Sequence, residues 1–277
     1  MTNPNAKPQL HVSMLNTLSA CGIKFKRRYG HRFGLHDVEE ITPPSVALIT
    51  GITTHKACEM NLRHMMVNDF KPAPWTEIRE LIIQEFAHSW NKGVELMPEE
   101  EVNADFTYET ALNQTLALSN LHYDSVAPGL RPINVEKKFV IELTNKPIDL
   151  AGTIDVIEMN CIRDTKTSKG AIKSARTTQM AMYCIAYKVE TGKYPSKVVL
   201  DVLKKLKTPK ANTVIATPDD VWIQPLLNRV LRAIDVIAAA KDNPEVLVPA
   251  RSDDWVCSEK FCPYSSTCEF FIPLENE

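Results

Sequence analysis

The sequence predicts a mixed α/β fold in which helices flank a central mixed sheet. Three observations lead to this prediction. Helical periodicity dominates the first half of the chain, the middle contains runs of β type, and one helical stretch joins two of those runs as a crossover connection would. With 277 residues, the chain is long enough to bury an ordinary hydrophobic core without disulfide bonds.

The predicted elements alternate along the chain. Helical periodicity covers residues 13–29, 46–69, 75–91, 108–126, 174–191 and 218–241. The β-type runs are Ile133–Leu143, Ile148–Ile157, Cys161–Lys166, Lys197–Leu206 and Asn212–Ala216. Turn residues at 144–147 and 208–211 predict that the first two runs, and the last two, form hairpins.

These elements group into three consecutive regions. We expect a mainly helical region over 1–130, a core sheet with its crossover helix over 131–217, and a C-terminal helix with a cysteine-rich tail over 218–277. The tail contains proline, aromatic residues and cysteine, and it cannot bury much of its own surface. We therefore expect it to pack back on the N-terminal region, so that the chain forms one compact unit.

The composition is that of a globular protein, with 44% hydrophobic and 24% charged residues. No apolar stretch approaches the ~20 residues that span a bilayer, and the first residues lack the pattern of a secretory signal. We therefore expect a cytoplasmic protein that does not enter a membrane. Two local basic patches, Lys24–Tyr29 and Lys204–Lys210, are compatible with phosphate binding, although each also fits a solvated charged face.

One predicted hairpin carries an unusual set of charged residues. If its loop is centred on Met159 and Asn160, Asp155 and Asp164 lie opposite each other, roughly 5 Å apart, where like charges are destabilising. A bound Mg²⁺ or Mn²⁺ ion would remove this conflict. Lys166 points to the same face as Asp164, where it can orient an attacking water or stabilise developing charge. The alternative is a surface hairpin with an Asp–Lys ion pair.

This hairpin resembles the active site of the PD-(D/E)XK nuclease superfamily, in its RecB-like branch. In that branch a Gly-x-x-Asp strand, here ending at Asp155, precedes an Asp/Glu-x-Lys strand, here Asp164 to Lys166. The resemblance implies a restriction-endonuclease-like fold. It also implies that the backbone carbonyl of Thr165 is a metal ligand.

Two further motifs occur in the order expected for this branch. Residues 51–55 match Gly-x-x-x-His, which implies that His55 is a metal ligand on a helix. Downstream, Gln179 and Tyr183 match Gln-x-x-x-Tyr, and their spacing puts both side chains on one helical face. Arg176 lies one turn earlier, within reach of a phosphate. Taken singly, each of these residues also fits an ordinary core or surface position.

Two acids near these motifs have less specific signals. Glu136 lies on the strand before the hairpin, where related nucleases often carry an acid near the second metal position. A solvated glutamate is an equally good interpretation. Glu59, one turn after His55, either supports the metal ligands or belongs to the charged surface.

The cysteines suggest a second metal centre. Cys257, Cys262 and Cys268 lie in a tail with little regular structure, and Cys21 precedes a basic and aromatic run. This arrangement resembles the iron–sulfur members of the RecB-like branch, the AddB-type and CRISPR-associated exonucleases, and implies a [4Fe–4S] cluster that joins the chain ends. The four residues between Cys257 and Cys262 depart from the usual two. Tetrahedral zinc is the alternative. The cysteines at apolar positions are expected to be buried hydrophobic residues: Cys58, Cys161 and Cys184.

Together, the motifs imply a metal-dependent DNA exonuclease that uses one or two Mg²⁺ or Mn²⁺ ions. The expected substrate is DNA that is single-stranded or has a free end. The sequence has no Walker-type phosphate loop, so any unwinding would come from a partner such as a helicase, and an integrase is another possible partner. The alternative function is a catalytically inactive, DNA-binding scaffold subunit of a recombination, repair or CRISPR-adaptation complex.

Overall fold

The computed structural model describes residues 7–38 and 42–273, which form two compact units. The terminal unit comprises Met1–Thr42, Val140–Gly152 and Gln224–Glu277, and the central unit comprises Pro43–Phe139 and Thr153–Ile223. These units are discontinuous in sequence. The three consecutive regions proposed from the sequence stay a prediction.

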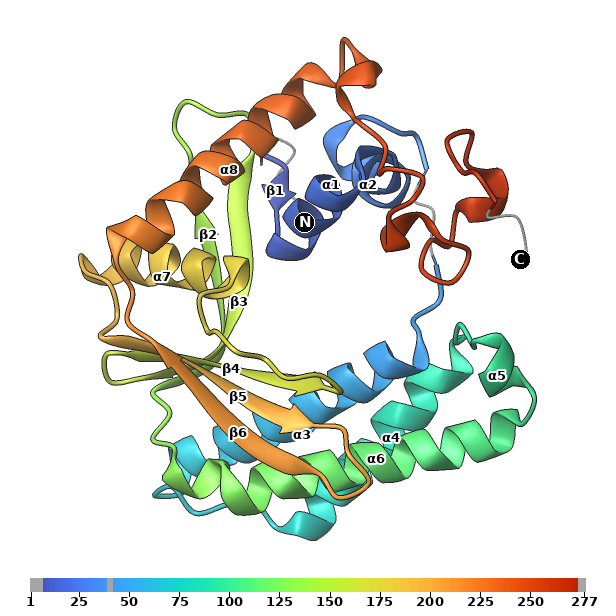
Figure 1. The fold of residues 1–277 in the computed structure, drawn as a ribbon. Coiled ribbons are helices and arrows are strands. Elements are labelled where there is room, and N and C mark those ends of the chain that lie inside the picture. Colours follow the sequence, from blue (N-terminus) through green and yellow to red (C-terminus); the bar gives the residue numbers. More distant parts are fainter. Residues whose placement is uncertain (1–6, 39–41, 274–277) are drawn as a thin grey trace. The chain divides into compact units, whose positions relative to one another are not determined.

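A mixed sheet runs through the central unit and confirms the predicted fold class (Figure 1). Its strands are β2 (Asn134–Ile141), β3 (Asp149–Glu158), β4 (Cys161–Ser168), β5 (Lys197–Lys204) and β6 (Lys210–Ala216). The β3–β4 and β5–β6 pairs are antiparallel, whereas β4 and β5 are parallel. The predicted crossover helix, α7 (Thr178–Thr191), connects the two parallel strands. Both predicted pairs of strands are paired in the sheet. The predicted turn at 144–147 lies between β2 and β3, whereas the connection between β5 and β6 is residues 205–209, so β6 begins within the predicted turn at 208–211.

The helices of the central unit cover both faces of this sheet. They include α3 (Val46–Val67), α4 (Trp75–Asn91), α5 (Pro98–Glu101), α6 (Ala104–Ser125) and the short η2 (Ala127–Gly129). Figure 1 shows α6 and α7 on opposite sides of β4 and β5. Helix α4 has the predicted bounds, whereas the four-residue α5 is too short to produce a readable periodicity.

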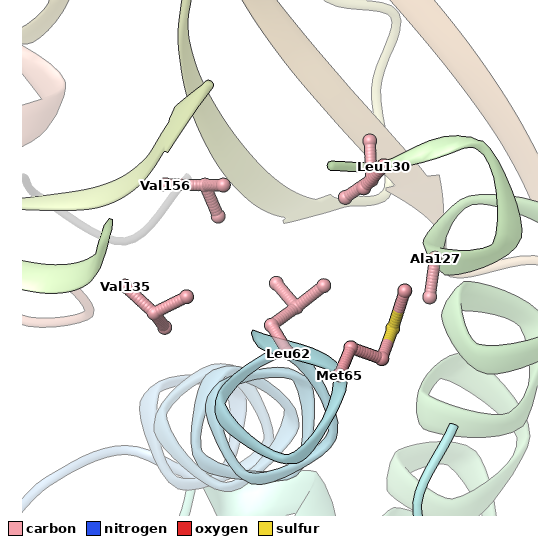
Figure 2. Close-up of a cluster of buried hydrophobic side chains, with 6 residues drawn as sticks. All are labelled: Leu62, Met65, Ala127, Leu130, Val135 and Val156. Carbon is pink, nitrogen blue, oxygen red and sulfur yellow. The ribbon is translucent and has the colours of Figure 1, made fainter. Parts of the chain in front are cut away.

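Helix α3 is fixed to the sheet by buried apolar side chains. Leu62 and Met65 of α3 pack with Val135 of β2 and Val156 of β3, and all four are at most 5% exposed (Figure 2). Burying such side chains contributes about 1.5–3 kcal/mol each. This packing places α3 beside the two strands that carry Glu136 and Asp155.

The terminal unit contains short elements from both ends of the chain. Strand β1 (Gln9–Leu10) pairs in parallel with the start of β3. The helical elements are α1 (Val12–Ala20), α2 (Gly22–Tyr29), η1 (Gly30–Phe33), η3 (Pro244–Val246), η4 (Trp255–Cys257), η5 (Ser265–Thr267) and most of α8 (Asp220–Ala239). No helix in the described ranges is long and apolar enough to cross a membrane.

The prediction of one continuous helix over 13–29 was wrong. Cys21 is extended, with φ −159° and ψ 114°, and separates α1 from α2. At the break, the N–H of Gly22 donates to the carbonyl of Val248 at 2.7 Å. A Cβ atom on Gly22 would lie 2.7 Å from the carbonyl carbon of Leu247, so only glycine fits this close approach. Helical periodicity does not reveal such a tertiary contact.

Helix α7 begins at Thr178, four residues later than the predicted start at 174. The side chain of Thr177 caps the helix by accepting a hydrogen bond from the N–H of Met180 at 3.2 Å. A threonine cap satisfies one of the free N–H groups of the first turn and so favours this start. The preceding residues, 171–177, are irregular and do not belong to the helix.

The β3–β4 hairpin has the register predicted from its turn, with Glu158 paired to Cys161 and Val156 to Arg163. Asn160 in this turn has φ +58°, a left-handed conformation that asparagine tolerates better than most residues. Its carbonyl also accepts hydrogen bonds from Ser196.

We expect Asn160→Ala to lower the free energy of unfolding by about 1 kcal/mol, because alanine is strained at this φ. Asn160→Gly keeps the same backbone hydrogen bonds without the strain and should be close to neutral. Urea unfolding of the two variants measures the difference. Equal destabilisation by both substitutions would contradict the assignment of the cost to backbone conformation.

Candidate active site

The β3–β4 hairpin places the predicted acids and lysine side by side. The Asp164 carboxylate is fully buried, and Nζ of Lys166 lies 3.0 Å and 2.9 Å from its two oxygens. Ladder pairing ends at Val156 and Arg163, beyond which Oδ2 of Asp155 accepts a hydrogen bond from the N–H of Thr165 at 3.2 Å. The carboxylate of Asp155 therefore contacts the backbone of β4.

A second acid and a histidine join Asp155. Ligand atoms of His55, Glu136 and Asp155 all lie within 4.8 Å of one another. Nδ1 of His55, on α3, is 3.2 Å from Oδ2 of Asp155. Two carboxylates and an imidazole suit a divalent cation such as Mg²⁺ or Mn²⁺. Asp164 is not in this tight set, because its carboxylate is held by Lys166.

Glu136 reaches this cluster through an unusual backbone conformation. Its φ is +52°, which is rare for a residue with a side chain and costs on the order of 1–3 kcal/mol. In a regular strand, neighbouring side chains point to opposite faces. Here Val135 and Glu136 both line the small cavity that also contains His55 and Leu62. The left-handed residue therefore brings the Glu136 carboxylate to the side of α3.

The crowding of acids shows in their protonation. Burial, followed by the charges of Asp155 and Glu59, raises the pKa of Glu136 to about 7. Burial and the charge of Asp155 also raise the pKa of Asp164, against the opposing effect of Lys166. For His55, burial lowers the pKa, but the hydrogen bond and charge of Asp155, with the charge of Asp164, outweigh it and raise the pKa. A bound cation would relieve the repulsion among the carboxylates.

Lys166 begins a chain of hydrogen bonds that runs to α7. Its Nζ donates to Oε1 of Gln179 at 2.7 Å, and Nε2 of Gln179 donates to the hydroxyl of Tyr183 at 2.6 Å. Burial, with the charges of Asp155 and Asp164, raises the pKa of Tyr183, so its hydroxyl stays protonated. The Gln-x-x-x-Tyr spacing predicted one helical face, and the structure shows that this face holds the lysine ammonium group.

The site opens into a cleft of about 570 Å³. The cleft is lined by the residues of the cluster, by small and apolar residues of α3, and by residues of β3, β4 and α7. The lining residues include Ala47, Gly51, His55, Glu136, Asp155, Lys166, Thr167 and Gln179. The candidate ligands and the lysine therefore face one solvent-accessible space.

Two other residues considered from the sequence differ in their placement. Arg176 donates to Asp219 at 3.1 Å and does not line the cleft. Glu59 accepts from Arg63 at 2.7 Å but also lines the cleft with His55 and Glu136, and its charge helps to raise the pKa of Glu136.

The sequence analysis missed a buried ion pair on the neighbouring strands. Arg163 donates two hydrogen bonds of 2.9 Å to Asp201, whose side chain is 2% exposed. Arg163 directly precedes Asp164, so this pair ties β4 to β5 next to the predicted catalytic acid. The available signal was a single aspartate inside the apolar run of β5, which requires a buried partner.

The four predicted cluster cysteines come together in the terminal unit. Cys21, Cys257, Cys262 and Cys268 are half-buried free thiols that line one cavity. Burial, followed by the charges of the other three thiols, raises the pKa of Cys257. The remaining cysteines are buried, as expected: Cys58, Cys161 and Cys184.

Comparison with known proteins identifies the family of this site. The PD-(D/E)XK nuclease superfamily matches residues 9–269, and the chain therefore belongs to it. A solved structure described as a candidate exonuclease, from Eubacterium rectale, has a TM-score of 0.53 and 13% identity, covering 87% of this chain and 86% of that one. The structure of SSO0001 has a TM-score of 0.33 and 15% identity, covering 90% of this chain and 95% of that one. No curated protein matches the sequence.

Family membership confirms the predicted superfamily and its mixed α/β fold. The similarity to the Eubacterium rectale structure supports that fold alone, because so few residues are identical. The roles of the individual site residues stay predictions, as does membership of the RecB-like branch.

We predict that Glu136→Gln changes how the stability of the metal-free protein depends on pH. Because the pKa of Glu136 is raised to about 7 from 4.5, the protonated side chain stabilises the fold at low pH, and this stabilisation is lost as the pH rises through 7. From about pH 5 to pH 8, the free energy of unfolding of Glu136→Gln should rise relative to wild type by on the order of 2 kcal/mol.

Urea unfolding in EDTA at the two pH values measures this difference. Glu142→Gln provides a control, since Glu142 lies in the connection between β2 and β3 and does not line the cleft. If wild type and Glu136→Gln differ in free energy of unfolding by the same amount at both pH values, the raised pKa of Glu136 is contradicted.

Proposed function

We propose that this protein is a divalent-metal-dependent deoxyribonuclease of the exonuclease type, in the RecB-like branch. The observation that carries the proposal is the convergence of His55, Glu136 and Asp155 in one cleft with Lys166, which is paired with the buried Asp164. The membership of the nuclease superfamily supports phosphodiester hydrolysis. The Eubacterium rectale neighbour shares the fold and is described as a candidate exonuclease, and we propose the same kind of activity for this chain.

The residues fit a metal centre. His55, Glu136 and Asp155 would hold a Mg²⁺ or Mn²⁺ ion, with Asp164 and the carbonyl of Thr165 as further ligands. Oδ2 of Asp164 is buried without a hydrogen-bond donor in suitable geometry, although Nζ of Lys166 is 2.9 Å away, so this oxygen has capacity to bind a cation. When bound, the metal polarises the phosphate and lowers the pKa of an attacking water.

Lys166 supplies a positive charge to the reacting phosphate. Its ammonium group is fixed between Asp164 and Gln179, and Gln179 is in turn fixed by Tyr183. A donor held in place before the reaction stabilises developing negative charge without reorganisation. Gln179 and Tyr183 therefore position the lysine, and the side chain of Lys166 is 32% exposed and accessible from the cleft.

The proposed substrate is DNA that is single-stranded or has a free end. The cleft of about 570 Å³ is large enough for a nucleotide but lies beside buried acids, so a flexible end enters more readily than the middle of a duplex. Unwinding of duplex DNA would require a partner, for which we propose a helicase or integrase.

We predict that Asp164→Asn abolishes cleavage. Purified wild-type protein should degrade end-labelled single-stranded DNA with Mg²⁺ or Mn²⁺ and not in EDTA, whereas Asp164→Asn should be at least about 10²-fold slower. Asp124→Asn, on the surface of α6, is a matched control that should retain activity. Wild-type protein that binds DNA but never cleaves it would contradict the proposal and favour the scaffold function.

We further propose that the four cysteines hold a structural [4Fe–4S] cluster. What supports the proposal is that all four thiols line one cavity of the terminal unit, as a shared metal centre requires. Tetrahedral zinc on the same thiolates is the alternative. The cluster would bind both chain ends, α2 and the tail, within the terminal unit.

The cluster proposal predicts a brown protein after anaerobic purification, with about four iron and four sulfide ions per chain. Cys262→Ser should lose the colour and most of the iron, whereas Cys184→Ser, in a buried position on α7, should keep both. Iron and sulfide assays of the folded fraction measure the outcome. A colourless wild-type protein that contains zinc would contradict the cluster.

A further inference from the structure

Lysines gather where strands β4 and β5 end. Lys204 closes β5 and is paired directly with Lys210 of β6, although like charges placed opposite each other destabilise a sheet. Lys205 and Lys207 lie in the loop between these strands, and Lys169 follows β4. No carboxylate in the described part of the chain forms an ion pair with any of the five, which we call the strand-end lysines.

The strand-end lysines adjoin the proposed catalytic cleft. Nζ of Lys205 lies 3.4 Å from the carbonyl of Ala47, and Ala47 lines the cleft. The N–H of Lys205 also donates to Ser168, the residue after the cleft-lining Thr167, at 2.8 Å. Burial and the charge of Lys169 lower the pKa of Lys205, which shows that these cations repel each other. A polyanion would relieve this repulsion.

The pairing of β4 with β5 gives the distance between the strand-end lysines and Asp164. Asp164 pairs with Leu200, and Ser168 pairs with Lys204, four residues further along both strands. At about 3.3 Å per residue, this separation is roughly 13 Å. It corresponds to about four steps of a stacked nucleic-acid strand at about 3.4 Å each. The β5–β6 hairpin that carries the lysines is visible in Figure 1 beside α6.

We propose that the strand-end lysines bind the backbone phosphates of the nucleic-acid strand whose scissile bond lies in the cleft. This inference rests on the proposed nuclease function. The strand-end lysines would form a phosphate track, that is, a row of cations along which the uncut part of the strand lies. Lysine binds phosphate as a point charge and needs no particular base, so the track is independent of sequence. An acidic protein fits less well, since the centres of protein interfaces are depleted in lysine.

The test uses the triple variant Lys204→Gln, Lys207→Gln and Lys210→Gln in the Asp164→Asn background, where the strand stays intact. Binding of a labelled single-stranded oligonucleotide is measured over a range of salt concentrations. Each lost phosphate contact lowers the slope of log affinity against log salt by about 0.7, so the triple variant should lose roughly 2 units of slope. Its affinity at low salt should fall at least about tenfold.

A matched control removes three lysines at the opposite end of β5. Lys188, Lys193 and Lys197 lie on α7, in the following loop and at the first residue of β5. Their replacement by glutamine changes the net charge by the same amount and should leave the salt slope unchanged. An equal loss of affinity in both triple variants would overturn the track, because it would reflect overall charge alone.

Kinetics separate this inference from the proposed function. With Asp164 intact, the strand-end variant should raise KM for a long oligonucleotide while kcat and the cleavage of a dinucleotide stay unchanged. Binding is measured without cleavage, so an inactive wild-type protein would refute the nuclease proposal and leave the binding result readable. Unchanged DNA affinity of the strand-end variant would overturn the phosphate track. Loss of binding to polyglutamate without loss of binding to DNA would also overturn it and would indicate an acidic protein as the ligand.

Discussion

The repulsion among Glu136, Asp155 and Asp164 is the constraint on which the rest of the central unit depends. Three carboxylates around one hairpin oppose folding, because burial and, after it, the charge of Asp155 raise the pKa values of Glu136 and Asp164. A fold keeps such a cluster only where other interactions offset the cost or where a ligand does. In this protein Lys166 neutralises part of the charge, and a divalent cation on His55, Glu136 and Asp155 would neutralise the rest.

The surrounding elements hold the cluster in place. The apolar contacts of Leu62 and Met65 fix α3, and with it His55, against β2 and β3 (Figure 2). The crossover from β4 to β5 brings Gln179 and Tyr183 of α7 to Lys166. The buried Arg163–Asp201 pair ties together the strands beneath the site. Packing of helices against a twisted sheet thus supplies the rigidity that a preorganised site requires.

Local patterns predicted much of this arrangement. The turn at Met159 and Asn160 gave the correct hairpin register, and strand alternation placed Lys166 beside Asp164. The conformation of Glu136 was out of reach, because its positive φ depends on packing against α3 and leaves no mark on the periodicity. The break at Cys21 likewise depends on the distant chain at Leu247 and Val248. Both the conformation of Glu136 and the break at Cys21 depend on contacts between segments that are far apart in the sequence.

The central claim is that the charge cluster of the hairpin exists to bind a divalent metal. Anomalous diffraction from crystals soaked in Mn²⁺ tests it most directly, because the signal locates the ion independently of activity. The account predicts a peak about 2.2 Å from ligand atoms of His55, Glu136 and Asp155. A fully active protein whose Mn²⁺ peak lies away from all three residues would contradict it.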